Sequence, residues 1–395
     1  FVGREEILDQ IRRQVMRRGN VVLLEGNRRP GKSSILRHLE GPHAVPGWMG
    51  VYSSLQAAEG SSSGRGVPTV EVFRTIAGNI AECLQKLGVE VPLPNGDVLS
   101  ATQTLGVSKA CREGISKESA FSDFREYTEV VLKLLNQHDM GLLLMLDEFD
   151  KLQEGIDSGM TSPQVPENFR YLVQTYPRFS AILTGSRRLK RLRMEYWSAL
   201  YGLGTRFGVS SLSDAAAERL ITEPVKGRLT YSSEGMKRAV YLTAGQPFLL
   251  QCLCNRVFDM AAQLRIRSIT IDHVNQASIA LVEDNEHFAS LWDYAELHRR
   301  RFLLAVCHQA SSTGTPLTLG AIQDFMVQNE IEISDDILVA DLDFLRELEI
   351  IAMTNSPDGA SYCLAIPMMG IWMDKQWDFN ALLAKARLEL EEQHG

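Results

Sequence analysis

The feature that most constrains this chain is an apolar run that leads into a glycine-rich loop and then into a helical pattern. Residues 21–24 are four apolar residues in a row, which predict a short buried strand. Residues 26–33 (GNRRPGKS) fit the pattern G-x-x-x-x-G-K-[ST], and apolar residues follow at helical spacing. A strand, this loop and a helix in that order predict a phosphate-binding site at the start of the helix.

Each residue type in this loop has a physical role in phosphate binding. Gly26 and Gly31 allow backbone N–H groups to curl around an anion. Lys32 is placed to reach the β- and γ-phosphates, and the Ser33 hydroxyl is placed to bind Mg²⁺. We therefore expect ATP or ADP, together with Mg²⁺, as the cofactors.

A second motif, residues 141–150 (GLLLMLDEFD), places an acidic pair after an apolar run. Five apolar residues in succession are typical of a strand buried on both faces of a parallel sheet. Asp147 and Glu148 then lie at the carboxyl end of that strand, where open α/β sheets bind their ligands. We expect Asp147 to hold Mg²⁺ through its water shell and Glu148 to polarise the attacking water. The alternative, a solvated acidic turn, is disfavoured by the loop upstream.

A third apolar run, within residues 179–187 (FSAILTGSR), predicts another buried strand that ends in polar residues. We expect Thr184, Ser186 and Arg187 to face the γ-phosphate. The basic segment that follows, residues 187–193 (RRLKRLR), has three interpretations: a solvated face, a contact to a neighbouring subunit, or a surface for a polyanion.

Size and charge limit the class of protein. A chain of 395 residues exceeds the size at which one core keeps growing, so two or three domains are expected. A formal net charge of −8 is unusual for a protein that grips nucleic acid over a wide face. The six cysteines show no metal-ligand spacing, and no signal peptide or 18-residue apolar run is visible. These observations predict a cytoplasmic protein with no membrane partner.

The periodicity changes along the chain and predicts its domains. Residues 1–211 predict an α/β core with a parallel sheet and helices on both faces, interrupted by an aperiodic insertion at 88–118. Residues 212–292 predict an α-helical lid, and 293–380 predict three helices and a hairpin, which make a winged helix. Residues 381–395 predict a charged helical tail or linker that leaves the last domain.

The order of these motifs resembles the STAND branch of P-loop NTPases, close to its bacterial and archaeal AAA-like ATPases. Residues 2–5 (VGRE) are similar to the motif that lies near the adenine, and residues 28–33 (RRPGKS) to an arginine-containing Walker A. Residues 146–148 (LDE) resemble Walker B, and 184–187 (TGSR) resemble the sensor at the end of the fourth core strand. Residues 245–247 (GQP) resemble the G-x-P motif, whose proline packs on adenine from the lid.

The resemblance implies a set of site residues. Nucleotide contacts are expected from Val2, Gly3, Arg4, Gly26, Asn27, Arg28, Arg29, Pro30, Gly31, Lys32, Ser33, Ser34, Thr184, Ser186 and Pro247. Lys32, Glu148 and Arg187 are the expected catalytic residues. Ser33 and Asp147 are the expected metal ligands.

The resemblance also implies a function. The relatives are slow, regulatory ATPases that rest closed with ADP, exchange to ATP on a signal, and then oligomerise and activate an effector. Many bacterial examples are linked to defence against phage. We therefore expect self-association when ATP is bound. We also expect a protein effector or trigger outside residues 1–395 or on another chain, because no nuclease or protease signature is present.

Two other functions stay open: a DNA-associated AAA-like ATPase of the origin-initiator or transposition-regulator type, and a housekeeping NTPase that does not oligomerise. The expected recognition helix, residues 334–349, bears on the first of these. It carries Arg346 as its one basic residue against Asp335, Asp336, Asp341, Asp343, Glu347 and Glu349. Such a helix would repel phosphates in a major groove, so DNA is a disfavoured partner and a protein partner is expected.

Overall fold

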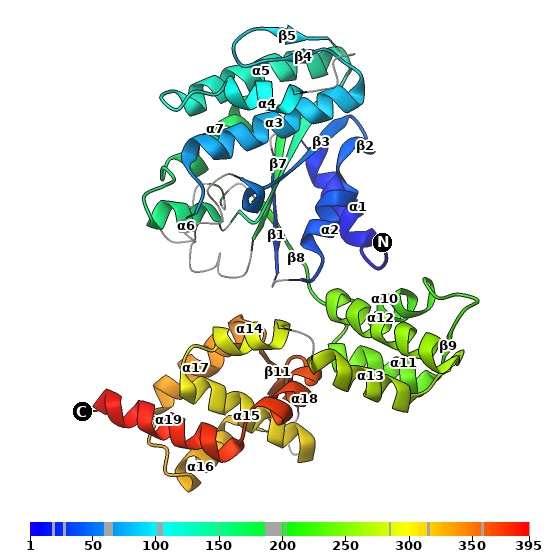
Figure 1. Cartoon of the computed structure of the whole chain (residues 1–395). Helices are drawn as coiled ribbons and strands as arrows, with labels where there is room; N and C mark the ends of the chain where they lie inside the picture. Colours follow the sequence, from blue (N-terminus) through cyan, green and yellow to red (C-terminus); the bar gives the residue numbers. More distant parts are fainter. Residues whose placement is uncertain are drawn as a thin grey trace. The chain divides into compact units, whose positions relative to one another are not determined.

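The computed structural model describes residues 1–17, 20–26, 29–58, 66–100, 106–149, 151–185, 200, 202, 204–283, 286–313, 317–356 and 359–394. The chain forms two compact units, one running to Val209 and the other beginning at Ser210 (Figure 1). Each unit has its own apolar interior. No helix in the described part of the chain is long and apolar enough to cross a bilayer.

The first unit is built on a six-stranded mixed sheet. Its strand order is β2 (Gly41–Val45), β3 (Trp48–Ser54), β6 (Gly141–Asp147), β7 (Phe179–Gly185), β1 (Val21–Glu25) and β8 (Gly204–Gly208). All neighbouring strands run parallel except β2, which pairs antiparallel with β3 at the edge. The predicted α/β class is confirmed, with this antiparallel edge strand as a correction to the all-parallel expectation.

Helices cover both faces of this sheet (Figure 1). One face packs against α1 (Glu5–Val15) and α2 (Lys32–His38). The opposite face packs against α3 (Thr69–Leu87), α4 (Val107–Glu113), α5 (Ala120–Gln137) and α7 (Val165–Thr175). Successive residues of a strand point to opposite faces, so Leu144 joins one core and Met145 the other. A continuous apolar run is the expected result when both faces are covered.

The strand register brings the three polar strand ends to one edge of the sheet. Leu24 of β1 pairs with Thr184 of β7, and Leu146 of β6 pairs with Leu183. Because these strands are parallel, the residues that follow β1, β6 and β7 come out at the same carboxyl edge. Ser54 of β3 pairs with Asp147, so the end of β3 reaches this edge as well.

Several short elements of the first unit depart from the expectation. The segment 88–118, expected to lack regular structure, contains the hairpin β4 (Val91–Pro92) and β5 (Val98–Leu99), and then α4. The short helices η1 (Leu55–Ala57) and α6 (Lys151–Asp157) were also not expected. Elements of two to seven residues are too short to show a clear period, and tertiary contacts stabilise them instead.

The second unit is mainly helical. Its first part contains α10 (Asp214–Thr222), α11 (Ser233–Thr243), α12 (Pro247–Leu264), α13 (Ile271–Glu283) and α14 (His287–Tyr294), with the short strands β9 (Thr230–Tyr231) and β10 (Ser268–Ile269) pairing in parallel. Its second part contains α15 (His298–Thr313), α16 (Leu319–Gln328), α17 (Asp335–Glu347) and the hairpin β11 (Ile351–Ser356) and β12 (Gly359–Leu364), followed by α18 (Pro367–Gln376) and α19 (Phe379–His394). The order from α15 to β12 is that of the predicted winged helix.

Serine and threonine side chains begin several of these helices. Ser213, Ser232, Thr318 and Ser334 each accept a hydrogen bond from a backbone N–H in the first turn of the helix that follows. One apolar cluster extends through this unit from Leu212 to Leu390. The separation of 212–292 from 293–380 as distinct domains therefore stays a prediction.

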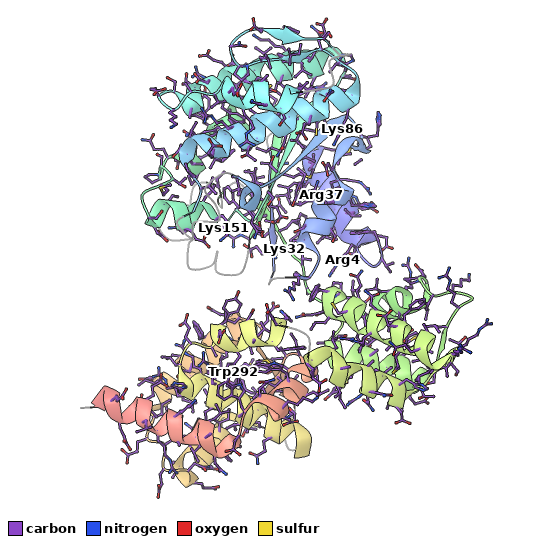
Figure 2. The ribbon with its side chains drawn as sticks, in the orientation of Figure 1. Arg4, Lys32, Arg37, Lys86, Lys151 and Trp292 are labelled. Atoms are coloured by element: carbon purple, nitrogen blue, oxygen red, sulfur yellow. The ribbon has the colours of Figure 1, made fainter. Side chains whose placement is uncertain are left out.

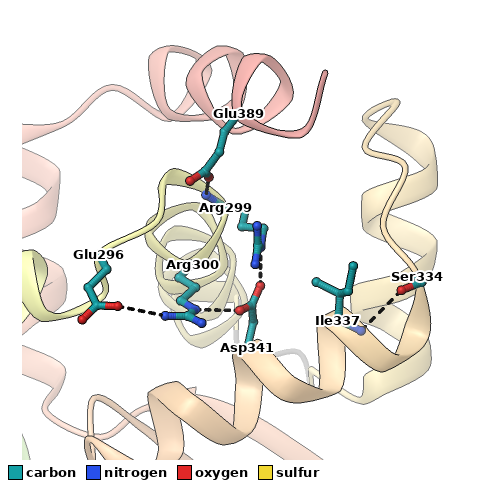
Figure 3. A network of polar contacts seen from close by, with 7 residues as sticks. All are labelled: Glu296, Arg299, Arg300, Ser334, Ile337, Asp341 and Glu389. Atoms are coloured by element: carbon teal, nitrogen blue, oxygen red, sulfur yellow. Dashed lines mark hydrogen bonds and ion pairs between the residues drawn. The ribbon is translucent and has the colours of Figure 1, made fainter. Parts of the chain in front are cut away.

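The C-terminal segment and one acidic residue differ from the expectation. Residues 381–395 were expected to leave the domain, but α19 packs along α15 and buries Leu382, Ala386 and Leu390. Asp341 was counted with the acidic face of α17, but it is only 1% exposed and binds two arginines (Figure 3). The helical period explains this, since Asp341 lies on the same side as the buried Leu338 and Leu345.

Candidate functional site

The glycine-rich loop follows the carboxyl end of β1, and a hydrogen bond joins its first and last parts. The Lys32 ammonium donates to the carbonyl oxygen of Gly26 across 2.9 Å, so the side chain spans the loop. Gly31 has φ of 100° immediately before α2, a conformation that glycine adopts readily. At Gly26 a Cβ atom would lie 2.3 Å from the carbonyl oxygen of Val209, so no larger residue fits. Ser33 and Ser34 are exposed in the first turn of α2, while Asn27 and Arg28 lie outside the described residues.

The start of the chain contacts this loop through one arginine. Arg4 precedes α1, and its Nη2 donates to the carbonyl oxygen of Pro30 across 2.9 Å. Burial lowers the pKa of the Arg4 guanidinium. Lys32 and Arg4 are both labelled in the first unit in Figure 2. The structure thus joins Arg4 to the loop, and adenine contacts from Val2 and Gly3 stay predictions.

The carboxylate of Asp147 is fixed from several sides. It is 4% exposed, and its Oδ1 accepts hydrogen bonds from the Thr184 hydroxyl and, across 3.1 Å, from the backbone N–H of Glu148. Its Oδ2 accepts from the Tyr52 hydroxyl across 3.0 Å. Burial and the neighbouring Asp147 charge raise the pKa of Tyr52 to about 12, so this phenol keeps its proton at neutral pH.

Glu148 has a different environment from its neighbour. Its φ is 57°, a left-handed conformation that turns the chain at the end of β6. The backbone N–H of Phe149 donates to the carbonyl of Thr184 across 2.8 Å and secures this turn. The Glu148 carboxylate accepts from Ser54 Oγ across 3.2 Å. With its amide nitrogen facing Glu148, Gln56 donates to both carboxylate oxygens at 2.9 and 3.0 Å.

The donor set can be compared with what Mg²⁺ requires. Within the described residues no cluster of three or more His, Cys, Asp or Glu side chains could hold a metal ion. A magnesium ion that binds with nucleotide needs few protein ligands, because phosphate oxygens and water complete its octahedron. An exposed Ser33 hydroxyl and an Asp147 carboxylate with donors on both oxygens fit that arrangement. The residues therefore fit direct binding by Ser33 and water-mediated binding by Asp147.

The structure brings together most of the predicted residues of the first unit, but not all are described. Thr184, Asp147 and Glu148 meet at the carboxyl edge as expected. Ser186, Arg187 and the rest of the basic segment 187–193 lie outside the described residues. Pro247 begins α12 in the second unit, after Gly245, whose carbonyl accepts from the Leu212 N–H across 2.9 Å. Contact between Pro247 and adenine stays a prediction.

The contributions of Tyr52, Ser54 and Gln56 to this site were not expected from the sequence. Tyr52 and Ser54 lie near the end of β3, where Ser54 pairs with Asp147 of β6 and Tyr52 pairs with Met145, two residues earlier. Polar residues at aligned strand ends would have indicated these site residues, but the alignment is known only once the neighbouring strands are known. A polar residue at the end of any core strand of this sheet was therefore a candidate for the site.

This sheet, its phosphate loop and the acidic pair at the carboxyl edge define a P-loop ATPase fold. The Walker-type ATPase PABY2304 of Pyrococcus abyssi has a similar structure, with 17% identity and a TM-score of 0.63 over 95% of this chain and 96% of that one. The Aeropyrum pernix ORC2 protein, in its ADPNP and ADP complexes, is 12% identical, with a TM-score of 0.59 over 99% of this chain and 94% of that one.

No protein-family model and no curated protein matches the sequence. At these identities the likeness to solved structures shows the fold alone. The likeness confirms the P-loop ATPase part of the resemblance drawn from the motifs. Assignment to the STAND branch stays a prediction.

Proposed function

We propose that this chain binds Mg²⁺–ATP in the loop before α2 and hydrolyses it slowly. The observation that carries the proposal is the meeting of Lys32, Asp147, Glu148 and Thr184 at one edge of the sheet. Lys32 would move from the Gly26 carbonyl to the β- and γ-phosphates. Ser33 and, through water, Asp147 would hold Mg²⁺, which neutralises charge on the phosphates when bound. Glu148 would orient and polarise the attacking water.

Lys32→Ala tests nucleotide binding. The substitution removes the cation that reaches the phosphates but leaves the α2 helix favourable, since alanine is a good helix former. Calorimetry should show ATP binding by the parent and at least about a hundredfold weaker binding by the variant, the loss of roughly 2.7 kcal/mol for a charge-assisted contact. Lys86→Ala, at an exposed position near the end of α3, is the matched control and should bind as the parent does. Unchanged ATP affinity in Lys32→Ala would reject the assignment.

We further propose that the ATPase acts together with DNA, as a DNA-associated AAA-like ATPase of the origin-initiator type. The support is the likeness to ORC2, which extends over 99% of this chain and 94% of that one and so includes the second unit. The basic segment 187–193 supplies positive charge for phosphate contacts in a chain whose net charge is −8.

The second candidate is a STAND-type switch that responds to a protein trigger and controls an effector in bacterial antiphage defence. One observation favours it: the exposed side of α17 still carries Asp335, Asp336, Asp343 and Glu347 against Arg346, even with Asp341 buried. This side is unsuited to a major groove but suited to a protein. Binding of duplex DNA by the full chain at physiological salt separates the two candidates, since the switch requires none.

A further inference from the structure

Two side chains outside the motifs, Tyr52 and Arg37, are connected to the carboxylate that is expected to serve Mg²⁺, Tyr52 directly and Arg37 through the Tyr52 ring. The Tyr52 hydroxyl donates to Asp147 Oδ2 across 3.0 Å. The guanidinium carbon of Arg37 lies 3.6 Å from the centroid of the Tyr52 ring, a cation–π distance. Tyr52 of β3 therefore joins Thr184 of β7 in positioning Asp147, and Arg37 of α2 contributes through the Tyr52 ring.

Tyr52 completes the hydrogen bonding of a buried carboxylate. Thr184 and the Glu148 backbone N–H donate to Oδ1, and Tyr52 donates to Oδ2. A carboxylate with donors on both oxygens has a fixed orientation and shares its charge with those donors. It is suited to accept a hydrogen bond from a metal-bound water, because its direct coordination of the metal would compete with these bonds.

The position of Arg37 also relates α2 to this carboxylate. Residues four apart lie on one side of a helix, so Ser33 lies one turn before Arg37 on the same side of α2. The side of α2 that carries the expected metal ligand is therefore also the side from which Arg37 contacts the Tyr52 ring. Arg37 also pairs with Glu40 across 2.8 Å, which limits its rotation.

We infer that Tyr52 is a positioning residue for the Mg²⁺ site, which fixes the second oxygen of Asp147, and that Arg37 holds the Tyr52 ring in place. The inference rests on the proposed function, because it names how that site sets its affinity for Mg²⁺. Removal of an outer-shell partner of a metal ligand typically weakens metal binding by about 10–100-fold.

The experiment is a Mg²⁺ titration of fluorescent ADP-analogue binding to the full chain, with metal-free affinity measured in EDTA. Tyr52→Phe removes only the hydroxyl and should raise the Mg²⁺ midpoint about tenfold, with metal-free affinity unchanged. Arg37→Met keeps an unbranched, flexible side chain but removes the guanidinium group and its charge, and should raise the midpoint by a smaller factor. Tyr171→Phe, at an exposed tyrosine of α7, is the matched control and should leave it unchanged.

A purely structural role for Tyr52 would lower thermal stability without changing the Mg²⁺ midpoint. A midpoint raised by at least about threefold in Tyr52→Phe supports the inference, whereas a smaller rise, no change or a fall overturns it. If Tyr52→Phe does not fold, the Mg²⁺ midpoint of Arg37→Met decides: a rise supports the inference, and no change or a fall overturns it. Nucleotide binding by the parent protein distinguishes failure of the proposed function from failure of the inference. If the parent binds no nucleotide, both are rejected. If the parent binds nucleotide but Tyr52→Phe leaves the Mg²⁺ midpoint unshifted, only the inference is rejected.

Discussion

Asp147 and Glu148 are adjacent in sequence, but the fold gives their carboxylates different surroundings. Asp147 is buried and has donors on both oxygens. Glu148 is half-buried, and its left-handed backbone turns it toward Ser54 and Gln56. This difference supports the division of labour that the motif predicts, with Asp147 at the metal and Glu148 at the water.

Glu148→Gln should therefore separate binding from hydrolysis. Glutamine keeps the shape of the side chain but cannot polarise water as a carboxylate does. We expect ATP affinity within about twofold of the parent and turnover at least about a hundredfold lower, typical of the loss of a general base. Single-turnover hydrolysis and equilibrium binding measure the two effects. Glu167→Gln, at an exposed position of α7, is the control, and equal turnover in Glu148→Gln and the parent would contradict the role.

Asp341 shows how a residue-level assignment depends on the fold. Its two oxygens accept from Arg299 Nε and Arg300 Nε, both across 2.6 Å, and Arg300 also lies 3.7 Å above the Phe344 ring (Figure 3). The backbone N–H of Arg299 donates to Glu389 across 2.8 Å. Asp341 thus joins α17 to α15, and Glu389 joins α19 to α15.

Asp341→Asn should destabilise the second unit strongly. It leaves two largely buried guanidinium groups without their shared counter-charge, which costs about 3–5 kcal/mol when a buried pair is broken. Urea denaturation measures the free energy of unfolding. Asp343→Asn, two residues later on the same helix but exposed and paired with Arg346, should cost less than about 1 kcal/mol. Similar losses in both variants would show that the buried network adds nothing.

At the scale of elements, long periodic segments were predictable and short ones were not. The helical patterns expected within residues 212–292 and 293–380 became helices, among them α11, α12 and α16. The apolar runs became β1, β6 and β7, because a strand covered on both faces must be apolar throughout. β2 and β8 are the edge strands of the sheet and carry glycine and polar residues. Each pairs with one neighbouring strand, and neither has the continuous apolar run that identifies a central strand.

The residues of the candidate site that belong to local motifs were predictable, and those that the fold brings together were not. Lys32, Ser33, Asp147 and Glu148 belong to motifs whose spacing is local, so sequence alone locates them. Tyr52 and Arg37 contact each other across elements, and no local spacing relates them to Asp147. Asp341 was misjudged because the acidic segment 334–349 was taken for an exposed face. The charged tail 381–395 was expected to leave the domain, whereas α19 packs on α15 and buries Leu390.

The exposed side of α17 should not be the surface that reads DNA. Its one exposed cation is Arg346, which pairs with Asp343 across 2.9 Å. We expect Arg346→Ala to leave the duplex affinity of the full chain within about twofold, whereas a base-contacting arginine would cost about 1–3 kcal/mol. Fluorescence anisotropy with a labelled duplex measures this. A loss of that size in Arg346→Ala would place α17 in a groove despite its acidic neighbours.

At the scale of the whole molecule, the question is what nucleotide binding changes. A ligand that binds one of two states stabilises it by about 2.7 kcal/mol at a hundredfold excess over its Kd. Reversal of a two-state equilibrium from 99:1 to 1:99 needs roughly 5.5 kcal/mol of differential affinity. At that excess, nucleotide binding would supply only about half of this free energy, so a switch of this kind would need a second ligand that binds the same state.

The proposed function assigns that second contribution to duplex DNA, and the STAND alternative assigns it to a protein trigger. Light scattering on Glu148→Gln, which should retain ATP, separates them. We expect one mass with ADP, the same mass with ATP alone, and a larger assembly when ATP and duplex are both present. Lys32→Ala is the control and should show no nucleotide-dependent assembly. No assembly with duplex, but assembly with ATP and an added protein partner, would favour the switch, and one unchanging mass under all conditions would leave only a housekeeping NTPase that does not oligomerise.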